Sequence, residues 1–192
     1  MSVKHDQVVV GFDFSNSGEA ALERAIALAA LTPSNILHFV CAIEPHQPIP
    51  GIPAAGPIDY HYAEKVQLAL TEEVARRLRL ADITTRVHFY VHARIGKPAD
   101  EILEVAREVG ADLVIVGSKG NTGITRLVLG SVSERIVREA HCAVEVARPK
   151  TYKHVDLLQV VEVEPHHTYV PPHRYTYEEH RLSLRPPEWP LY

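Results

Sequence analysis

GKPADEILEVAREVGADLVIVG, residues 96–117, contains a complete helix followed at once by a buried strand. Pro98 suits the first helical turn, where its missing N–H is no loss, and Asp100 and Glu101 complement the positive end of the helix dipole. Gly110 follows the last turn, as glycine commonly does where a helix ends. The next run, LVIVG, is apolar without alternation, which is typical of a strand buried on both faces. The segment therefore favours an α/β fold.

The alternation of apolar strand and amphipathic helix continues on both sides of this segment. Strand-like runs are predicted at 7–15, 35–43, 84–92, 112–117 and 142–149. Helical patterns fill 17–31, 58–80, 96–111 and 131–140. A parallel sheet covered by helices buries both faces of its strands. We therefore predict a doubly wound five-stranded parallel sheet, in the common order 3-2-1-4-5, with helices on both faces.

The composition changes after residue 150. Residues 151–192 contain no glycine or alanine but hold 6 of the 14 prolines, 5 of the 8 tyrosines and 5 of the 12 histidines. We therefore divide the chain into an α/β domain over 1–150 and a Pro-, Tyr- and His-rich C-terminal arm over 151–192. The run VDLLQVVEVE (155–164) could add one strand, and the rest is expected to extend over a surface of its own or a partner subunit. The spacing of the arm's histidines matches no standard zinc site, so no metal centre is predicted.

Composition also narrows the classes of partner. The net charge of -4 and the pI near 6.3 give no electrostatic reason to expect nucleic acid or an anionic membrane. No apolar stretch is long enough to span a bilayer, and the chain opens with no leader-like pattern. Cys41 and Cys142 lie far apart in apolar runs and are expected to be reduced core thiols. These features predict a cytoplasmic protein that binds neither nucleic acid nor membrane.

A second stretch, GSKGNTGITRLVLGS at 117–131, carries four glycines between a strand and a helix. Its spacing does not match a P-loop, because Lys119 precedes Gly120, nor the dinucleotide fingerprint, which follows the first strand. Its position is informative, since ligands of open parallel sheets bind at the carboxyl ends of strands where the strand order reverses. The exits of the first and fourth strands, which carry Asp13 and Gly117, are expected to face each other across one crevice.

The end of this stretch indicates a phosphate site. Ser131 and Glu134 form the S-x-x-E pattern of a capping box, so a helix is predicted to begin at Val132. The N–H groups and the positive dipole of a helix N-terminus favour an anion. Gly130 would permit close approach of the backbone, and Arg126 is a nearby cation. The hydroxyl of Ser131 would serve the cap, the phosphate or both.

Four residues, Gly117-x2-Gly120-x9-Gly130-Ser131, resemble the ATP-binding signature G-x2-G-x9-G-[ST] of the universal stress protein family. The opening strand with its Ala-rich helix, the third helix with the fourth strand, and the closing strand resemble the same family, over roughly 5–148 in all. The resemblance implies an ATP site in which Mg²⁺ is carried by the phosphates, with ADP or AMP as alternatives. It also implies a homodimer, or a higher homo-oligomer, formed through the edge of the last strand.

The resemblance further implies roles for individual residues. Asp13 would contact the nucleoside, and the backbone near Phe39 or Val40 would meet the adenine. Phe39 stands where a smaller valine is usual, so a narrower adenine slot is expected. Ala143 replaces a usual proline beside the dimer edge. The complete set of predicted nucleotide-binding residues is Asp13, Phe39, Val40, Gly117, Lys119, Gly120, Arg126, Gly130 and Ser131.

Structural roles stay open for some of these side chains. Asp13 could instead hold the turn or cap the first helix, and Asn16 or Ser17 could also supply that cap. Lys119 and Arg126 could be solvated surface charges.

Three functions are compatible with the sequence. The first is an ATP-binding stress-response or regulatory protein whose occupancy and dimerisation modulate partners. The second is a slow ATP hydrolase, although Asp13 is the only acid near the predicted site, and no catalytic residue is predicted because no base is positioned to activate water. The third is a nucleotide-independent oligomeric scaffold that uses the last strand and the arm, since a long exposed strand edge invites pairing.

Overall fold

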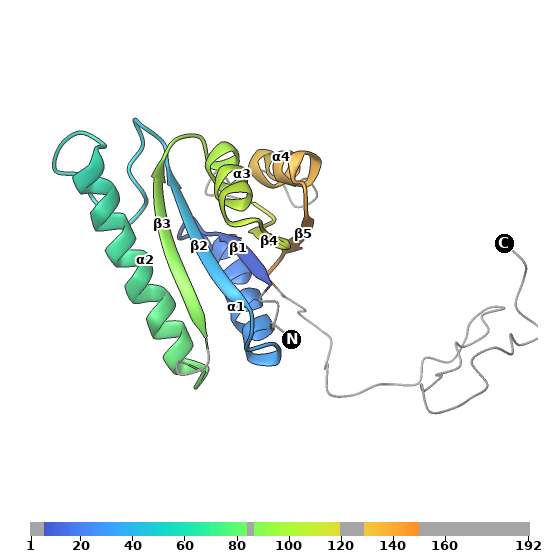
Figure 1. The fold of residues 1–192 in the computed structure, drawn as a ribbon. Helices are drawn as coiled ribbons and strands as arrows, with labels where there is room; N and C mark the ends of the chain where they lie inside the picture. The colour runs from blue at the N-terminus through green and yellow to red at the C-terminus, as the bar shows by residue number, and fades with distance from the viewer. Residues whose placement is uncertain (1–5, 84–86, 120–128, 150–192) are drawn as a thin grey trace, which may run out of the picture. The chain divides into compact units, whose positions relative to one another are not determined.

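The computed structural model describes residues 6–83, 87–119 and 129–149. Its centre is a parallel sheet of five strands in the order β3-β2-β1-β4-β5 (Figure 1). The predicted fold class and strand order are confirmed. The strands are β1 (Gln7–Gly11), β2 (Ile36–Ile43), β3 (His88–Ile95), β4 (Leu113–Gly117) and β5 (Ala143–Ala147). The helices are α1 (Asn16–Leu31), α2 (Tyr60–Leu80), α3 (Pro98–Val109) and α4 (Ser131–Glu139).

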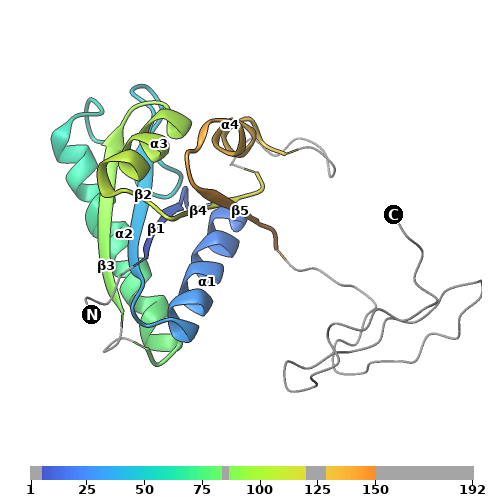
Figure 2. The same cartoon turned by 45° about the vertical axis from the view of Figure 1, so that its right-hand side comes forward.

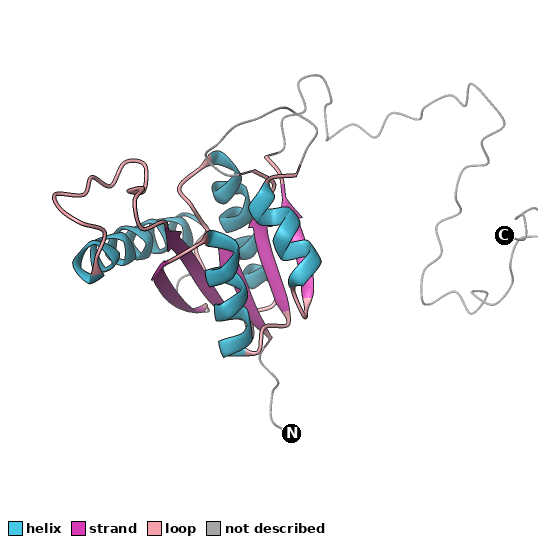
Figure 3. Cartoon of the chain, turned by 90° about the horizontal axis from the view of Figure 1, so that it is seen from above, coloured by secondary structure: helices cyan, strands magenta, loops and turns pink. Residues whose placement is uncertain are grey.

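The helices cover both faces of the sheet (Figure 2; Figure 3). Alternate residues of β2 separate two apolar cores, because successive side chains of a strand point to opposite faces. Phe39 packs in the core of α1 and α2, together with Leu22 and Leu70. Val40 packs in the core of α3 and α4, together with Ile102. This layering leaves the carboxyl ends of the strands to the loops.

Local signals set the ends of the helices. Ser15 caps α1, where its Oγ accepts a hydrogen bond from the Gly18 N–H at 3.1 Å. As predicted, Pro98 lies in the first turn of α3 and Gly110 follows its last residue, Val109, as a C-cap with a left-handed φ of 63°. Glycine adopts that conformation without the penalty that a Cβ would bring.

The start of α4 differs from the prediction. The helix begins at Ser131 rather than Val132, with Gly130 as its N-cap and no side-chain cap hydrogen bond. Gly130 takes the extended conformation of a cap, with φ -66° and ψ 150°, and its carbonyl accepts the first helical hydrogen bond from the Glu134 N–H at 2.8 Å. The predicted capping box is therefore wrong, and the exposed Ser131 hydroxyl is not used by a cap.

Two further expectations concern membrane spans and the C-terminal arm. Within those ranges, no helix combines the length and apolarity needed to cross a membrane. The C-terminal arm, 151–192, lies outside them, so the division of the chain at residue 150 stays a prediction.

Candidate functional site

A cavity of about 220 Å³ opens at the carboxyl ends of β1 and β4. Its lining includes Gly11 and Asp13 from the exit of β1, and Gly117 and Lys119 from the exit of β4. The two strands are neighbours in the sheet although they are distant in sequence, so the strand order reverses at this point. The predicted crevice between the two exits is confirmed.

The turn after β1 is built around Asp13. Its Oδ1 accepts hydrogen bonds from the Ser15 N–H at 3.1 Å and from the Ser15 hydroxyl at 2.5 Å. Phe14, between them, has a left-handed φ of 57°. Asp13 therefore holds the turn while also lining the cavity, and Ser15, rather than Asn16 or Ser17, supplies the helix cap.

Two glycines let α1 close down on this turn and on β4. A Cβ on Gly18 would lie 2.6 Å from Asp13 Oδ1, and a Cβ on Gly117 would lie 2.4 Å from the backbone oxygen of Ser17. Both glycines line the cavity. Gly18 was not among the predicted residues, although a glycine in the first turn of an Ala-rich helix was the signal that could have revealed it.

The wall formed by the start of α4 has the properties expected of an anion site. The Gly130 N–H donates to the Ser118 carbonyl at 2.9 Å, which joins the start of α4 to the end of β4. The buried Ser133 hydroxyl donates to the carbonyls of Ser118 and Gly130 at 3.4 and 3.3 Å. Ser131, Val132 and Ser133 line the cavity at the first turn of the helix. The first N–H groups of a helix have no acceptor within the helix, so this wall is suited to a negatively charged group.

The opposite wall is largely apolar. Val40 and Ala42 contribute from β2, and the proline-rich loop after β2 contributes Pro48, Ile49 and Pro50. None of the predicted nucleotide-binding residues lies in this loop. Its participation follows from the parallel sheet, in which the loop after β2 leaves from the same edge as those after β1 and β4.

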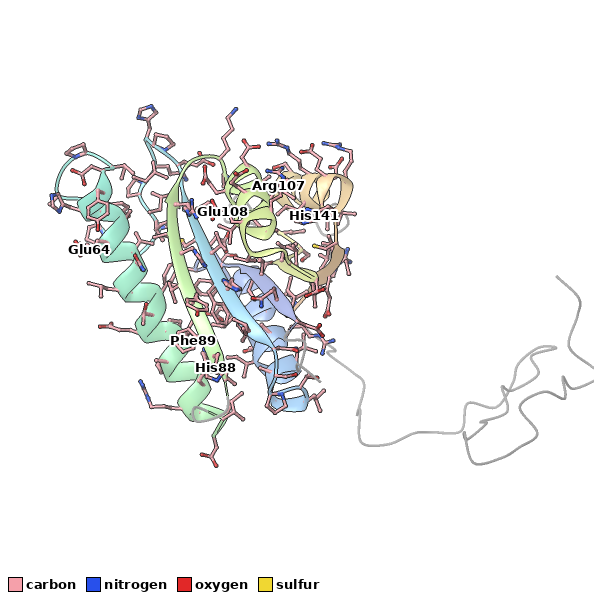
Figure 4. The ribbon with its side chains drawn as sticks, in the orientation of Figure 1. Glu64, His88, Phe89, Arg107, Glu108 and His141 are labelled. Atoms are coloured by element: carbon pink, nitrogen blue, oxygen red, sulfur yellow. The ribbon has the colours of Figure 1, made fainter. Side chains whose placement is uncertain are left out.

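Phe39 does not line this cavity. Its ring lies on the other face of the sheet, fully buried, and packs edge-to-face against Phe89 with ring centroids 6.2 Å apart (Phe89 is labelled in Figure 4). The expectation that its size narrows the slot is therefore wrong, because side chains alternate along the strand. Val40, the next residue, faces the cavity, and its carbonyl accepts from the Phe12 N–H at 2.9 Å.

Charged residues of both signs line the cavity. They are the acids Asp13 and Glu44 and the base Lys119. No group of three or more potential metal ligands is found among the residues that the structure describes. The predicted phosphate contacts Gly120 and Arg126 lie outside those residues and stay predictions.

The comparisons agree with this geometry. Residues 4–148 match the model of the universal stress protein family. The chain belongs to that family. It is 28% identical over 144 residues to Universal stress protein MJ0531 of Methanocaldococcus jannaschii, covering 75% of this chain and 82% of the relative. It is 26% identical over 162 residues to MJ0577 of the same organism, covering 78% and 99% of the two chains.

The solved structures that resemble this chain include one with a bound cyclic nucleotide. The crystal structure of a universal stress protein in complex with cAMP superposes with a TM-score of 0.54 at 26% identity. The similarity covers 75% of this chain and 97% of that relative. The recognised resemblance is thus confirmed at the level of family and fold.

Proposed function

We propose that the cavity binds an adenine nucleotide, with ATP as the expected ligand, and that occupancy gives the protein a regulatory role in stress responses. The observation that carries the proposal is the contrast between its two walls. One wall is apolar and comes from β2 and the loop after it, whereas the other is the N-terminus of α4 beside Gly117 and Lys119. A nucleotide has the same two parts, because its base is flat and largely apolar whereas its phosphate chain is negatively charged.

The walls fix a direction for the ligand. The adenine would pack against Val40 and the proline-rich loop, and Asp13 would accept hydrogen bonds from the ribose hydroxyls. The phosphates would lie at Gly117, Gly130 and the first turn of α4, where backbone N–H groups and the helix dipole favour negative charge.

Charged side chains would complete the phosphate site. Lys119 lines the cavity, and we expect it to contact the phosphates together with Gly120, Arg126 and the Ser131 hydroxyl. Mg²⁺ would be carried by the phosphates rather than by protein ligands. The relative that binds cAMP supports an adenine nucleotide as the class of ligand.

The direct test is to identify the nucleotide that the purified protein already carries. Protein prepared without added nucleotide is denatured, and the supernatant is separated by anion exchange. ATP at close to one per chain is the expected result, and ADP or AMP would indicate turnover or a shallower site. An empty supernatant, together with no heat of binding on titration with ATP, ADP, AMP or cAMP, would overturn the proposal.

Asp13→Asn is expected to weaken ATP binding about tenfold, which is about 1.4 kcal/mol. The amide oxygen can still accept from Ser15, so the turn is kept while the charge-assisted hydrogen bonds to ribose are lost. Calorimetric titration measures the change, and Asp82→Asn, an exposed aspartate after α2, is the matched control. If Asp13→Asn bound ATP with unchanged affinity, the role of Asp13 would be to hold the turn and not to contact the ligand.

We expect little or no ATP hydrolysis. Asp13 already accepts two hydrogen bonds from Ser15. Glu44 follows β2 and lines the cavity with the apolar wall, whereas the proposed phosphate end is at β4 and α4. Hydrolysis needs a base within reach of the attacking water. The slow-hydrolase alternative would gain if Asp13→Asn kept its ATP affinity and lost a measurable turnover.

The assembly that we propose is a homodimer through β5. β5 is the last strand in the order β3-β2-β1-β4-β5 and pairs with β4 alone among the described strands, and we propose that a second chain pairs along its other edge. We also place the protein in the cytoplasm, because Cys41 and Cys142 are free thiols and such thiols are typical of reducing compartments.

Removal of residues 151–192 tests this assembly. We expect light scattering to give a dimer mass for both the full chain and the truncated chain, since the open edge belongs to β5. A full chain that is monomeric would contradict the proposal. A truncated chain that alone becomes monomeric would assign the interface to the arm, and the scaffold alternative would lead if neither form bound nucleotide.

A further inference from the structure

The hydroxyl of Tyr62, in the first turn of α2, makes two buried hydrogen bonds to the loop after β2. It accepts from the Ile49 N–H at 2.8 Å and donates to the Ile52 carbonyl at 2.7 Å. The Tyr62 side chain is 5% exposed and both isoleucines are 8% exposed. Buried hydrogen bonds of this kind are costly to remove, because the remaining donor or acceptor would have no hydrogen-bond partner in the protein or in water.

The two bonded residues are the ends of one β-turn. The Ile52 N–H donates to the Ile49 carbonyl at 3.0 Å, and Gly51 at the third position has a φ of 81°. Proline at the second position and a glycine with positive φ at the third are typical of a type II turn. Tyr62 therefore clasps both ends of a turn whose backbone is already stiffened by Pro50.

The same turn forms part of the apolar wall of the cavity. Pro48, Ile49 and Pro50 line it, whereas Tyr62 lies behind the turn and is not among the lining residues. A second contact, from Lys65 Nζ to the Pro53 carbonyl at 2.8 Å, is exposed and is expected to contribute little. The apolar wall is thus held by hydrogen bonds from Tyr62, a residue of α2.

We propose that Tyr62 is a positioning residue that presets this wall for the base, and that it thereby determines affinity for the nucleoside part of the ligand. The inference rests on the proposed function. Holding the wall in place before binding reduces the entropy lost when the base packs against it. The two hydrogen bonds of Tyr62 go to the turn after β2, whereas the phosphate end of the cavity is formed by other segments, the exit of β4 and the start of α4.

Tyr62→Phe tests the assignment, because it removes the hydroxyl and keeps the ring. We expect the Kd for adenosine to rise about tenfold, and the Kd for ATP to rise by the same factor because the phosphate contacts are retained. Amide exchange at Ile49 and Ile52 should accelerate. Tyr60→Phe, on the same helix but 75% exposed, is the matched control and should change none of these quantities.

Gly51→Ala perturbs the same turn without touching Tyr62. Its Cβ would meet nothing within 4 Å, so the only cost is the left-handed φ. This variant should also weaken adenosine binding, and it carries the test if Tyr62→Phe does not fold. All titrations are made well below the melting temperature of each variant.

The outcomes distinguish nucleotide binding by the cavity from the positioning role of Tyr62. Wild-type protein that binds neither adenosine nor ATP would overturn the proposed function and this assignment together. Wild-type binding with an unchanged adenosine Kd in Tyr62→Phe, even with a lower melting temperature, would reduce Tyr62 to a structural role. A larger loss for ATP than for adenosine would also overturn the assignment, since it would mean that the whole site had shifted.

Discussion

Gly117→Ala is expected to lower the free energy of unfolding by about 3 kcal/mol, at the upper end of the cost of overpacking. The new Cβ would lie 2.4 Å from the oxygen and 2.5 Å from the carbonyl carbon of Ser17. These are backbone atoms in the first turn of α1, so no side-chain rotation can relieve the contact. The helix must move away from β4.

That movement would also reach the cavity. The first turn of α1 is joined to the turn that holds Asp13 through the Ser15 cap. Displacing it would separate Asp13 from Gly117, so nucleotide affinity should fall by more than tenfold. Urea unfolding and calorimetric titration measure the two effects.

Two other glycines supply a graded control for this substitution. A Cβ on Gly130 would lie 3.3 Å from the Cα of Lys119, so Gly130→Ala should have an intermediate effect. A Cβ on Gly56 would meet nothing within 4 Å, so Gly56→Ala should be neutral or slightly stabilising. Equal stability losses at Gly117 and Gly56 would contradict the steric argument.

Lowering the pH from 6.5 to 4 is expected to remove on the order of 3 kcal/mol of stability through His38. This side chain is 6% exposed, and burial, with a smaller contribution from His92, lowers its pKa from 6.5 to about 4. A difference of one in pKa is worth about 1.4 kcal/mol. Between the two values the unfolded chain binds a proton that the folded chain does not, so stability falls as the pH falls through this window.

The hydrogen bonds of His38 act in the same direction as its burial. Gln7 Oε1 can only accept, so the His38 Nε2–H donates to it at 2.9 Å. His38 Nδ1 is then the acceptor for the His92 Nε2–H at 3.1 Å. Protonating Nδ1 would set two N–H groups against each other.

The surroundings of His92 act in the same direction. Burial and the nearby Arg94 lower the pKa of His92, while Glu108 raises it by a smaller amount. Arg94 and Glu108 form an ion pair between β3 and α3 (Glu108 is labelled in Figure 4). His92 therefore adds to the loss of stability on acidification.

Urea unfolding at pH values from 7 to 4 measures the effect. His38→Gln should lose most of the dependence of stability on pH between 6.5 and 4, whereas His61→Gln, an exposed histidine on α2, should keep it. The difference between wild type and His38→Gln isolates this residue from the carboxylates that also titrate at low pH. Parallel pH curves for wild type and His38→Gln would show that His38 does not cause the loss.

Much of the fold could be predicted because its signals are local. Pro98 and Gly110 bound α3 through their own dihedral preferences, and the apolar run at β4 indicates a strand buried on both faces. The start of α4 was misplaced because the serine of the S-x-x-E pattern, Ser131, lies inside the helix, and only the dihedrals of Gly130 settle which residue is the cap.

The candidate site divides in the same way. Asp13, Gly117 and Ser131 are predicted to bind nucleotide because strand exits and a helix start can be recognised in the sequence, and all three line the cavity. The sequence does not show that Phe39 faces away from the cavity and that Val40 faces it. The side to which each of these adjacent strand residues points depends on how the helices pack on the two faces of the sheet.

The sequence by itself determined five parallel strands, their covering helices and a crevice between the exits of β1 and β4. Only the tertiary structure decided that Ser17 touches Gly117, that Tyr62 clasps the turn at Ile49, and that His38 meets His92. Helix and strand signals depend on residues a few positions apart. Those three contacts join atoms that are distant in sequence or lie in different elements, and they exist only once the layers have packed.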